Sequence, residues 1–290
     1  MNKKKVLLVL SILALLFLMS GCAIPTDENG QFIRITDDTT FQYMMTNEGI
    51  FAAIFVYPLS KFINFMVPRT NVAVAIALVT VTINLVVTLL TWRSNMATQK
   101  MQMIQPELAR IQKKYEGRDD QNSKMRQAQE MQNLYNKHGI NPMGSLLVSF
   151  IQFPILIAMY HAVQRSVYVA NGSVFGLSLA TSPLQGISEG KYGYLVIFAL
   201  MVITQLISMK VPQWLSERRA KAEAEKHFRR YEKPANPNQA TMYFMMVFIS
   251  VLLISWPTSM SFYYVISSLT MILKNLLLDR FINKEMEAVK

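Results

Sequence analysis

Residues 71–91, NVAVAIALVTVTINLVVTLLT, contain no charged side chain. They are long enough to cross the hydrocarbon core of a bilayer as a helix, which takes about 20 residues. Four further stretches have a similar character, and the chain is 52% hydrophobic and only 16% charged. This composition argues against a soluble domain and predicts an all-α polytopic membrane protein with five transmembrane helices. We place them at 69–91, 143–164 and 192–209, with the last two as a hairpin within 241–279.

Basic residues are distributed unevenly among the segments that connect these helices. Of the 29 Lys and Arg, three lie in the first five residues, 21 lie in 92–142, in 210–240 or from Lys274 onward, and five lie elsewhere. Cytoplasmic loops collect Lys and Arg, so we expect these basic segments inside the cell and the 165–191 loop outside. The asymmetry accounts for the net charge of +11, and we predict no direct recognition of nucleic-acid sequence.

Residues 1–21 have the order of a secretory signal: a basic start, an apolar run and small residues at the end. Ser20 and Gly21 directly before Cys22 resemble a lipobox, although Met19 stands where leucine is preferred. This pattern predicts cleavage before Cys22 and a lipid on its sulfur, which would anchor the mature N-terminus in the outer leaflet. An uncleaved signal anchor with an incidental cysteine is the alternative.

The segments between the predicted spans have different characters. Residues 22–46 are polar and acidic, and we expect an external linker that buries nothing. Residues 47–68 contain large apolar side chains with a few polar ones between them, which fits an amphipathic helix lying in the membrane interface. Within 92–142 apolar residues recur at helical spacing on both sides of a Gly117 break, which predicts a cytoplasmic helical hairpin ending at Gly139. The basic loop at 210–240 should be helical at most in part, and residues 280–290 form a cytoplasmic tail.

Polar side chains inside the predicted spans are concentrated in the cytoplasmic halves of the helices. Because a polar group in lipid needs a partner or water, we expect a hydrophilic groove that is open to the cytoplasm and to lipid but closed outside. Hydrogen bonds that only join the helices are the alternative. The residues assigned to the groove are Thr80, Asn84, Thr88, Ser149, Gln152, Gln205 and Ser267.

Several kinds of chemistry have no basis in this sequence. No Asp or Glu lies within the first four predicted spans, and Asp279 lies only at the edge of the fifth, which disfavours a coupled transporter. One cysteine and three scattered histidines offer neither a catalytic arrangement nor a metal cluster. We therefore predict no enzymatic activity, no cofactor and no metal.

Four segments together resemble the YidC/Oxa/Alb membrane insertase family in its Gram-positive lipoprotein form. They are FVYPLS at 55–60, KMQMIQPEL at 100–108, NPM at 141–143 with IQFPIL at 151–156, and FYYVIS at 262–267. The resemblance covers most of the mature chain. It implies a five-helix bundle in the cell membrane, whose groove receives the hydrophilic parts of a client protein.

The resemblance also implies contacts and partners. The client's apolar segment would slide along the spans at 143–164 and 259–279, and the candidate contact residues are Phe153, Pro154, Tyr263 and Tyr264. Nascent membrane proteins are the implied clients, and the ribosome, the secretion channel and membrane lipids are the other candidate partners. A membrane-embedded binding or regulatory partner that inserts nothing is the alternative function.

Two positions depart from the family pattern. The arginine that the family carries in its first span falls on Asn84, and its Tyr-Trp pair is Tyr263-Tyr264 here. Asparagine hydrogen-bonds to water and to peptide groups but does not attract acidic segments. We therefore hypothesise a divergent paralogue whose clients depend less on negative charge. Lys274 either supplies a displaced positive charge or extends to the inner interface.

Overall fold

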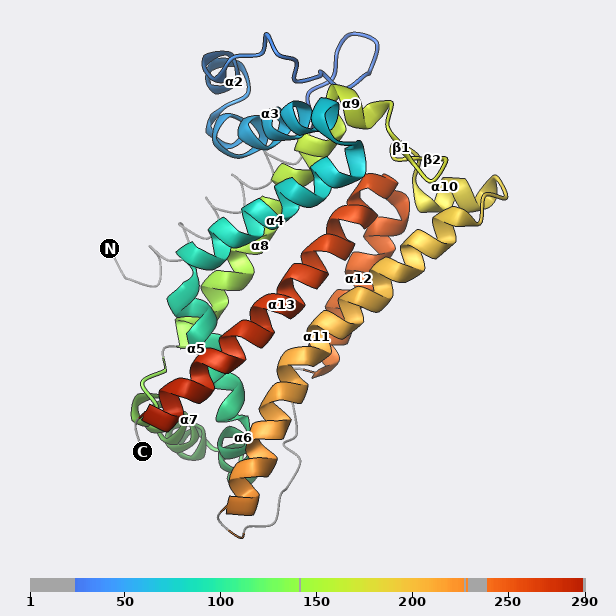
Figure 1. Ribbon diagram of the computed structural model, residues 1–290. Helices are drawn as coiled ribbons and strands as arrows, with labels where there is room; N and C mark the ends of the chain where they lie inside the picture. Colours follow the sequence, from blue (N-terminus) through green and yellow to red (C-terminus); the bar gives the residue numbers. More distant parts are fainter. Residues whose placement is uncertain (1–23, 141, 227, 229–238, 289–290) are drawn as a thin grey trace. The chain divides into compact units, whose positions relative to one another are not determined.

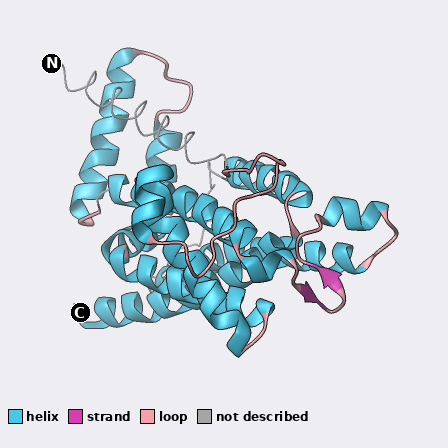
Figure 2. Cartoon of the chain, turned by 90° about the horizontal axis from the view of Figure 1, so that it is seen from above, coloured by secondary structure: helices cyan, strands magenta, loops and turns pink. Residues whose placement is uncertain are grey.

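The computed structural model describes residues 24–140, 142–226, 228 and 239–288, and most of them are helical (Figure 1). The predicted signal at 1–21 and Cys22 lie outside the described residues. The helices are α2 Phe41–Asn47, the π-helix η1 Ala52–Val56, α3 Tyr57–Met66, the 3-10 helix η2 Val67–Arg69, α4 Val72–Leu90, α5 Trp92–Met103, α6 Gln105–Lys114, α7 Gln121–Lys137, α8 Pro142–Arg165, α9 Val167–Ala170, α10 Pro183–Ser188, α11 Gly193–Lys226, α12 Gln239–Ser255 and α13 Thr258–Ala288. Ser173–Val174 (β1) and Leu177–Ser178 (β2) form a small antiparallel hairpin (Figure 2).

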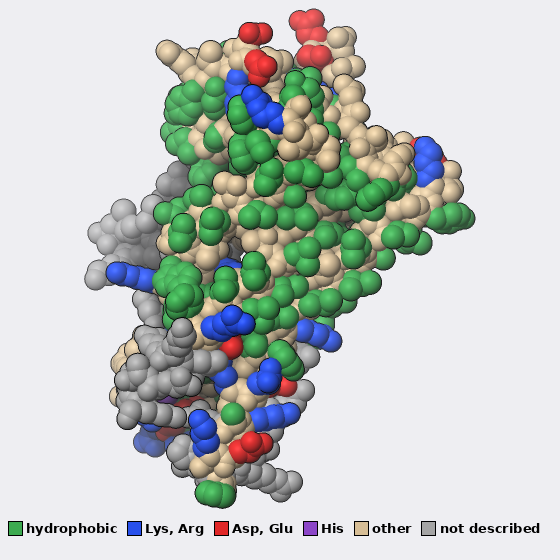
Figure 3. Space-filling model, in the orientation of Figure 1, with side chains coloured by type: hydrophobic (Ala, Val, Ile, Leu, Met, Phe, Trp, Pro, Cys, Tyr) green, Lys and Arg blue, Asp and Glu red, His purple; other side chains and the backbone are tan. Residues whose placement is uncertain are grey.

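Three helices in the described part of the chain are long and apolar enough to cross a membrane. Large hydrophobic side chains cover their exposed faces (Figure 3), as expected for helices whose solvent is lipid. The predicted span at 143–164 falls within α8. The first helix of the predicted hairpin within 241–279 corresponds to α12, which ends at Ser255 and contains a shorter apolar helix, Met246–Ser255. The three long apolar segments are Val72–Leu90, Gly193–Arg219 and Thr258–Phe281.

The chain divides into two compact units, and the long helices contribute residues to both. Unit 1 contains the residues up to Thr80, Phe150–Phe198 and Leu253–Tyr263. Unit 2 contains Val81–Ser149, Ala199–Leu252 and the residues from Tyr264 onward.

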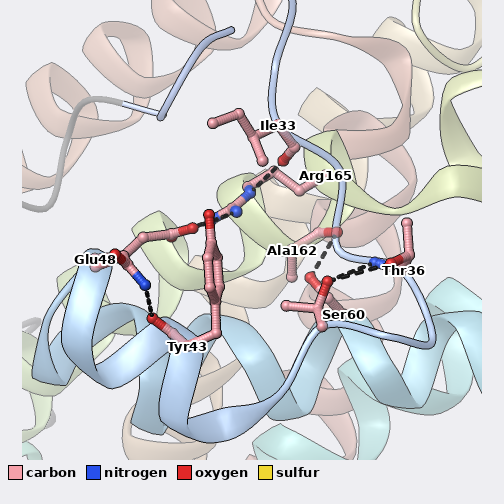
Figure 4. A network of polar contacts seen from close by, with 9 residues as sticks. Ile33, Thr36, Tyr43, Glu48, Ser60, Ala162 and Arg165 are labelled. Atoms are coloured by element: carbon pink, nitrogen blue, oxygen red, sulfur yellow. Dashed lines mark hydrogen bonds and ion pairs between the residues drawn. The ribbon is translucent and has the colours of Figure 1, made fainter.

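In unit 1 a buried ion pair fastens the N-terminal segment to the end of α8. Arg165 donates from Nη1 and Nη2 to the two carboxylate oxygens of Glu48, at 2.5 and 2.7 Å. Its Nε donates to the Ile33 carbonyl at 2.7 Å (Figure 4). The two charged side chains are only 1% and 7% exposed. A bidentate contact of this kind fixes geometry as well as charge.

Further hydrogen bonds extend this attachment. Asn64 in α3 donates to the Ile35 carbonyl at 2.7 Å and accepts from the Ser166 hydroxyl at 2.6 Å. Ile35 and Met44 are fully buried. The expectation that residues 22–46 bury nothing is therefore wrong. The Ile35 backbone N–H also donates to the Arg165 carbonyl at 2.9 Å, a contact with a distant part of the chain that local polarity does not indicate.

Also in unit 1, the β1–β2 hairpin and α10 lie against the first turn of α11. The Tyr194 hydroxyl donates to the Ser178 carbonyl at 3.2 Å, and the Tyr194 ring packs directly on Gly186 of α10. Leu177 packs on Gly193, where an added Cβ would lie 2.8 Å from a Leu177 methyl group. Both glycines are therefore required for close approach.

In unit 2, α6 and α7 form a helical hairpin around a small apolar core. Asp120 caps α7 by accepting from the Ser123 backbone N–H at 2.8 Å, as an N-cap residue does. Gly139, with a φ of 60°, follows the end of α7. Met125 and Ala128, which share the predicted helical spacing, are exposed. The buried core residues are Ile104, Leu108, Leu134 and Ile140.

Helix α11 is much longer than the apolar stretch at 192–209 and continues through Lys226. Residues 215–226 include Ala, Glu, Lys and Arg, which favour helix without needing burial. This extension is held to α13 by an ion pair in which Arg219 Nε donates to Asp279 Oδ1 at 2.7 Å. The first part of the predicted basic loop is therefore a continuation of a helix.

Candidate functional site: a polar ladder on α13

Two consecutive serines on α13 make hydrogen bonds to two different helices of unit 2. Asn84 Nδ2 on α4 donates to Ser267 Oγ at 3.3 Å. Ser268 Oγ donates to Gln205 Oε1 on α11 at 2.8 Å. Both serines are buried, so α13 is joined to α4 and α11 by uncharged side chains at the same level.

A second set of contacts lies two helical turns further along α13. Seven residues make about two turns, so Lys274 and Asn275 lie on the same face as Ser267 and Ser268. Lys274 Nζ donates to Asn95 Oδ1 on α5 at 3.3 Å. Gln99 Nε2, also on α5, donates to Asn275 Oδ1 at 3.2 Å. We call these two levels the polar ladder: Asn84, Gln205, Ser267 and Ser268, then Asn95, Gln99, Lys274 and Asn275.

The polar ladder combines neutral groups with one positive charge. Amides and hydroxyls both donate and accept hydrogen bonds, whereas the Lys274 ammonium group only donates. None of the eight side chains is a carboxylate, and the acidic side chain that follows on α13, Asp279, pairs with Arg219. The ladder is therefore suited to hydrogen-bonding peptide groups and water, and it carries a net positive charge while Lys274 is protonated.

The structure brings together some of the residues that the sequence assigned to the groove. Asn84, Gln205 and Ser267 belong to the polar ladder, and Thr88 donates to the Asn84 carbonyl at 2.6 Å. Thr80 is buried in unit 1, where it donates to the Ile76 carbonyl at 2.6 Å.

Two other predicted groove residues lie on α8. Gln152 is partly buried in unit 1. Ser149 belongs to α8, but its side chain lies outside the described part of the structure. A place in the groove for Thr80, Ser149 and Gln152 stays a prediction.

The four candidate client-contact residues differ in exposure. Phe153 on α8 is 47% exposed, and the neighbouring Pro154 is partly exposed. Tyr263 and Tyr264 on α13 are buried. In the described structure, Phe153 is therefore the most accessible aromatic side chain of this set.

Sequence reasoning did not assign Ser268, Asn95, Gln99 and Asn275. Two regularities could have indicated them. Asn95 and Gln99 continue the spacing of Asn84, Thr88 and Thr91 by two further steps of four. Ser268 and Asn275 are seven residues apart, which places them on one face of a helix.

The fold and the polar ladder define a polytopic helical membrane protein with hydrogen-bonded polar side chains in its apolar helices. The family model described as 60Kd inner membrane protein matches residues 62–285. The chain belongs to this family, which confirms the resemblance to the YidC/Oxa/Alb insertases.

Similar proteins match nearly the whole chain. Membrane protein insertase YidC 2 of Bacillus anthracis is 28% identical over 270 residues, covering 92% of this chain and 90% of that protein. Membrane protein insertase YidC of Oceanobacillus iheyensis is 29% identical over 297 residues, covering 99% and 100%. Membrane protein insertase MisCA of Bacillus subtilis is 26% identical over 279 residues, covering 95% and 92%.

Proposed function

We propose that this chain is a membrane protein insertase and chaperone, and that the polar ladder lines a hydrophilic groove for the polar parts of its clients. The similarity over nearly the full length to proteins named membrane protein insertases supports insertion over a binding or regulatory role. The polar ladder is the observation that carries the mechanism, because its first level gathers hydrogen-bonding side chains within α4, α11 and α13, which are otherwise apolar.

The ladder lowers the cost of moving a polar segment into the membrane. An unsatisfied peptide group in hydrocarbon costs several kcal/mol. Ladder amides and hydroxyls exchange their mutual hydrogen bonds for hydrogen bonds to the client's peptide groups, so few groups lose a partner. A groove that reaches only part of the membrane depth shortens the remaining apolar path. No nucleotide hydrolysis is needed for this step.

We further propose five crossings, with α8 and α12 added to the three long apolar helices. Helix α8 has 24 residues, which at a rise of 1.5 Å each span about 36 Å. The excess of Lys and Arg in 92–142 and in 210–240 supports a cytoplasmic position for both segments and for the C-terminus. Cys22 would then carry its lipid at the outer surface.

The apolar segment of a client would pass along α8 and α13. Phe153 on α8 is the preferred contact because its ring is exposed. In the family pattern an arginine in the first span carries the positive charge of the groove. Here Asn84 on α4 is neutral and Lys274 on α13 is cationic, which favours clients that depend little on acidic residues. The basic segments would bind either ribosomes or anionic lipid.

Reconstitution tests this function directly. The full-length protein in liposomes should protect a short single-span client from added protease, and empty liposomes should not. A known insertase serves as the positive control. If the client stays unprotected while the control insertase protects it, the binding or regulatory alternative replaces insertion.

A further inference from the structure

Most of the segment between α8 and α11, residues 166–188, carries no charged side chain. Between Arg165 and Glu189 the sequence contains no Asp, Glu, Lys, Arg or His. Connecting segments that face water are usually polar, but this one exposes large apolar side chains. More than a third of the surface of each is accessible: Val167, Tyr168, Phe175 and Leu184.

Phe175 is the most unusual of these residues. It occupies the first position of the two-residue turn that joins Val174 to Leu177. Phe175 has a φ of 54° and Gly176 a φ of 76°. Turns with two positive φ values favour Asn-Gly, because other side chains meet steric resistance in this conformation. The ring is also 92% exposed, so an unfavourable backbone conformation presents an apolar ring to the surroundings.

The turn is held at a defined position within unit 1. Leu179, which follows β2, is fully buried, and its N–H donates to the Gly172 carbonyl at 3.0 Å. The contacts of Leu177 with Gly193 and of Ser178 with Tyr194 attach the hairpin to the first turn of α11. The Phe175 ring is therefore kept near the level at which α11 begins.

At the start of α11 the chain changes from charged to apolar side chains. Glu189 and Lys191 form an exposed ion pair at 2.8 Å immediately before the helix. The apolar span follows directly at Gly193, and Leu195 and Val196 are exposed on it. Tyr192 is exposed between the two, and tyrosine is enriched at membrane–water interfaces.

We propose that the uncharged segment 166–188 lies in the interfacial layer of the bilayer, with the Phe175 ring inserted among the lipid chains beside the start of α11. The apolar surface of the segment continues into Tyr192, Leu195 and Val196, which belong to a membrane helix. A lipid surface is also the partner that a segment free of charge fits best, since protein interfaces have a polar rim. This loop would then fix the depth of α11.

Tryptophan fluorescence in liposomes tests the position of the ring. The full-length Phe175→Trp variant is reconstituted in vesicles of phosphatidylcholine and phosphatidylglycerol, with or without bromine on the upper part of the lipid chains. Emission of the parent, which has Trp92, Trp214 and Trp256, is subtracted. Asn29→Trp is the matched control, because Asn29 is an exposed residue in a polar turn of the same unit.

Brominated lipid should quench the added Phe175→Trp emission at least twofold and leave the added Asn29→Trp emission unchanged. Leu184→Trp gives an independent measurement at a second position in the segment, with quenching again expected. Equal, unquenched emission from all three variants would overturn the proposal. Shielding of the tryptophan from an aqueous quencher in native membranes, but not in liposomes, would also overturn it and would indicate a protein partner.

Discussion

Asn84 is the side chain that makes the α4 part of the polar ladder neutral. Replacing it with leucine removes the amide that donates to Ser267. A net hydrogen bond is worth about 0.5–1.5 kcal/mol, so we expect Asn84→Leu to lower the rate of client insertion by roughly two- to twelvefold. Asn84→Arg should keep activity, because guanidinium still donates hydrogen bonds.

The measurement is rescue of cells depleted of their own insertase, together with protease protection in liposomes. Leu85→Ala is the matched control, because Leu85 is exposed on the next position of α4. Equal rescue by wild type and Asn84→Leu would rule out a role for a polar group at this position.

Arg165 illustrates a charge whose role depends on burial. Sequence alone counts it as one of five basic residues on the outer side, but the structure buries it against Glu48. Removing one partner of a buried ion pair leaves an uncompensated charge, which costs about 3–5 kcal/mol. Arg165→Met should therefore lower the thermal unfolding temperature in detergent markedly, and Lys191→Met, in an exposed pair, should change it little. A similar small change for both variants would contradict this assignment.

At the scale of elements, a pair of charged side chains joins α6 to α7 beside the apolar core of the hairpin. Lys114 donates to Glu130 at 2.6 Å, and the Tyr115 hydroxyl donates to the same oxygen at 2.8 Å. The hydrogen bond from Lys114 lowers the pKa of Glu130 below its ordinary 4.5, and the same bond raises the pKa of Lys114 above 10.5. Hydrogen bonds from the Ser123 hydroxyl and then from its backbone N–H lower the pKa of Asp120, the cap of α7.

These directions set the pH dependence of the hairpin. A carboxyl whose pKa is lowered by folding stabilises above its unfolded pKa and loses that contribution as the pH falls through the folded value. An amine whose pKa is raised stabilises below 10.5 and loses its contribution as the pH rises through the folded value. We therefore expect α6 and α7 to separate more readily in acid, below the ordinary pKa of Glu130, and in strong alkali.

Distances between spin labels at Lys113 and Asn133, measured across a pH series, would report this separation. Glu130→Gln should abolish the change in label distance in alkali. It should weaken the change in label distance in acid, leaving the part due to Asp120. Asp119→Asn is the control, because the Asp119 side chain is 95% exposed. A pH profile that Glu130→Gln leaves unaltered would show that the pair does not hold the hairpin.

At the scale of the whole molecule, the distribution of Lys and Arg predicts orientation. The loop around Arg118 between α6 and α7 is exposed, and we propose that it faces the cytoplasm. Trypsin should cut there in inverted membrane vesicles and should fail to cut in intact protoplasts. A peptide tag attached after Lys290 should likewise be accessible to added protease in inverted vesicles and protected in intact protoplasts. Cleavage at Arg118 in protoplasts would reverse the proposed topology.

The sequence predicted the class of protein because that class depends on local properties. A long apolar run such as 71–91 is recognisable without knowledge of its neighbours, and the excess of basic residues is a matter of position along the chain. The same holds for the α6–α7 hairpin, whose glycines and helical spacing are local signals. The family resemblance added short motifs in a fixed order, and the match over residues 62–285 confirmed it.

Contacts between distant residues were decided only by the tertiary structure. The pairing of Arg165 with Glu48, of Ser268 with Gln205 and of Gln99 with Asn275 joins residues 63 to 176 positions apart. Composition and helical periodicity show which face of one helix is polar, but they do not show which helix that face meets. In the apolar run at 71–91, the sequence by itself determined a membrane helix with a polar stripe, and tertiary packing determined that Asn84 on this stripe meets Ser267, because a hydrogen bond requires two groups within about 3 Å.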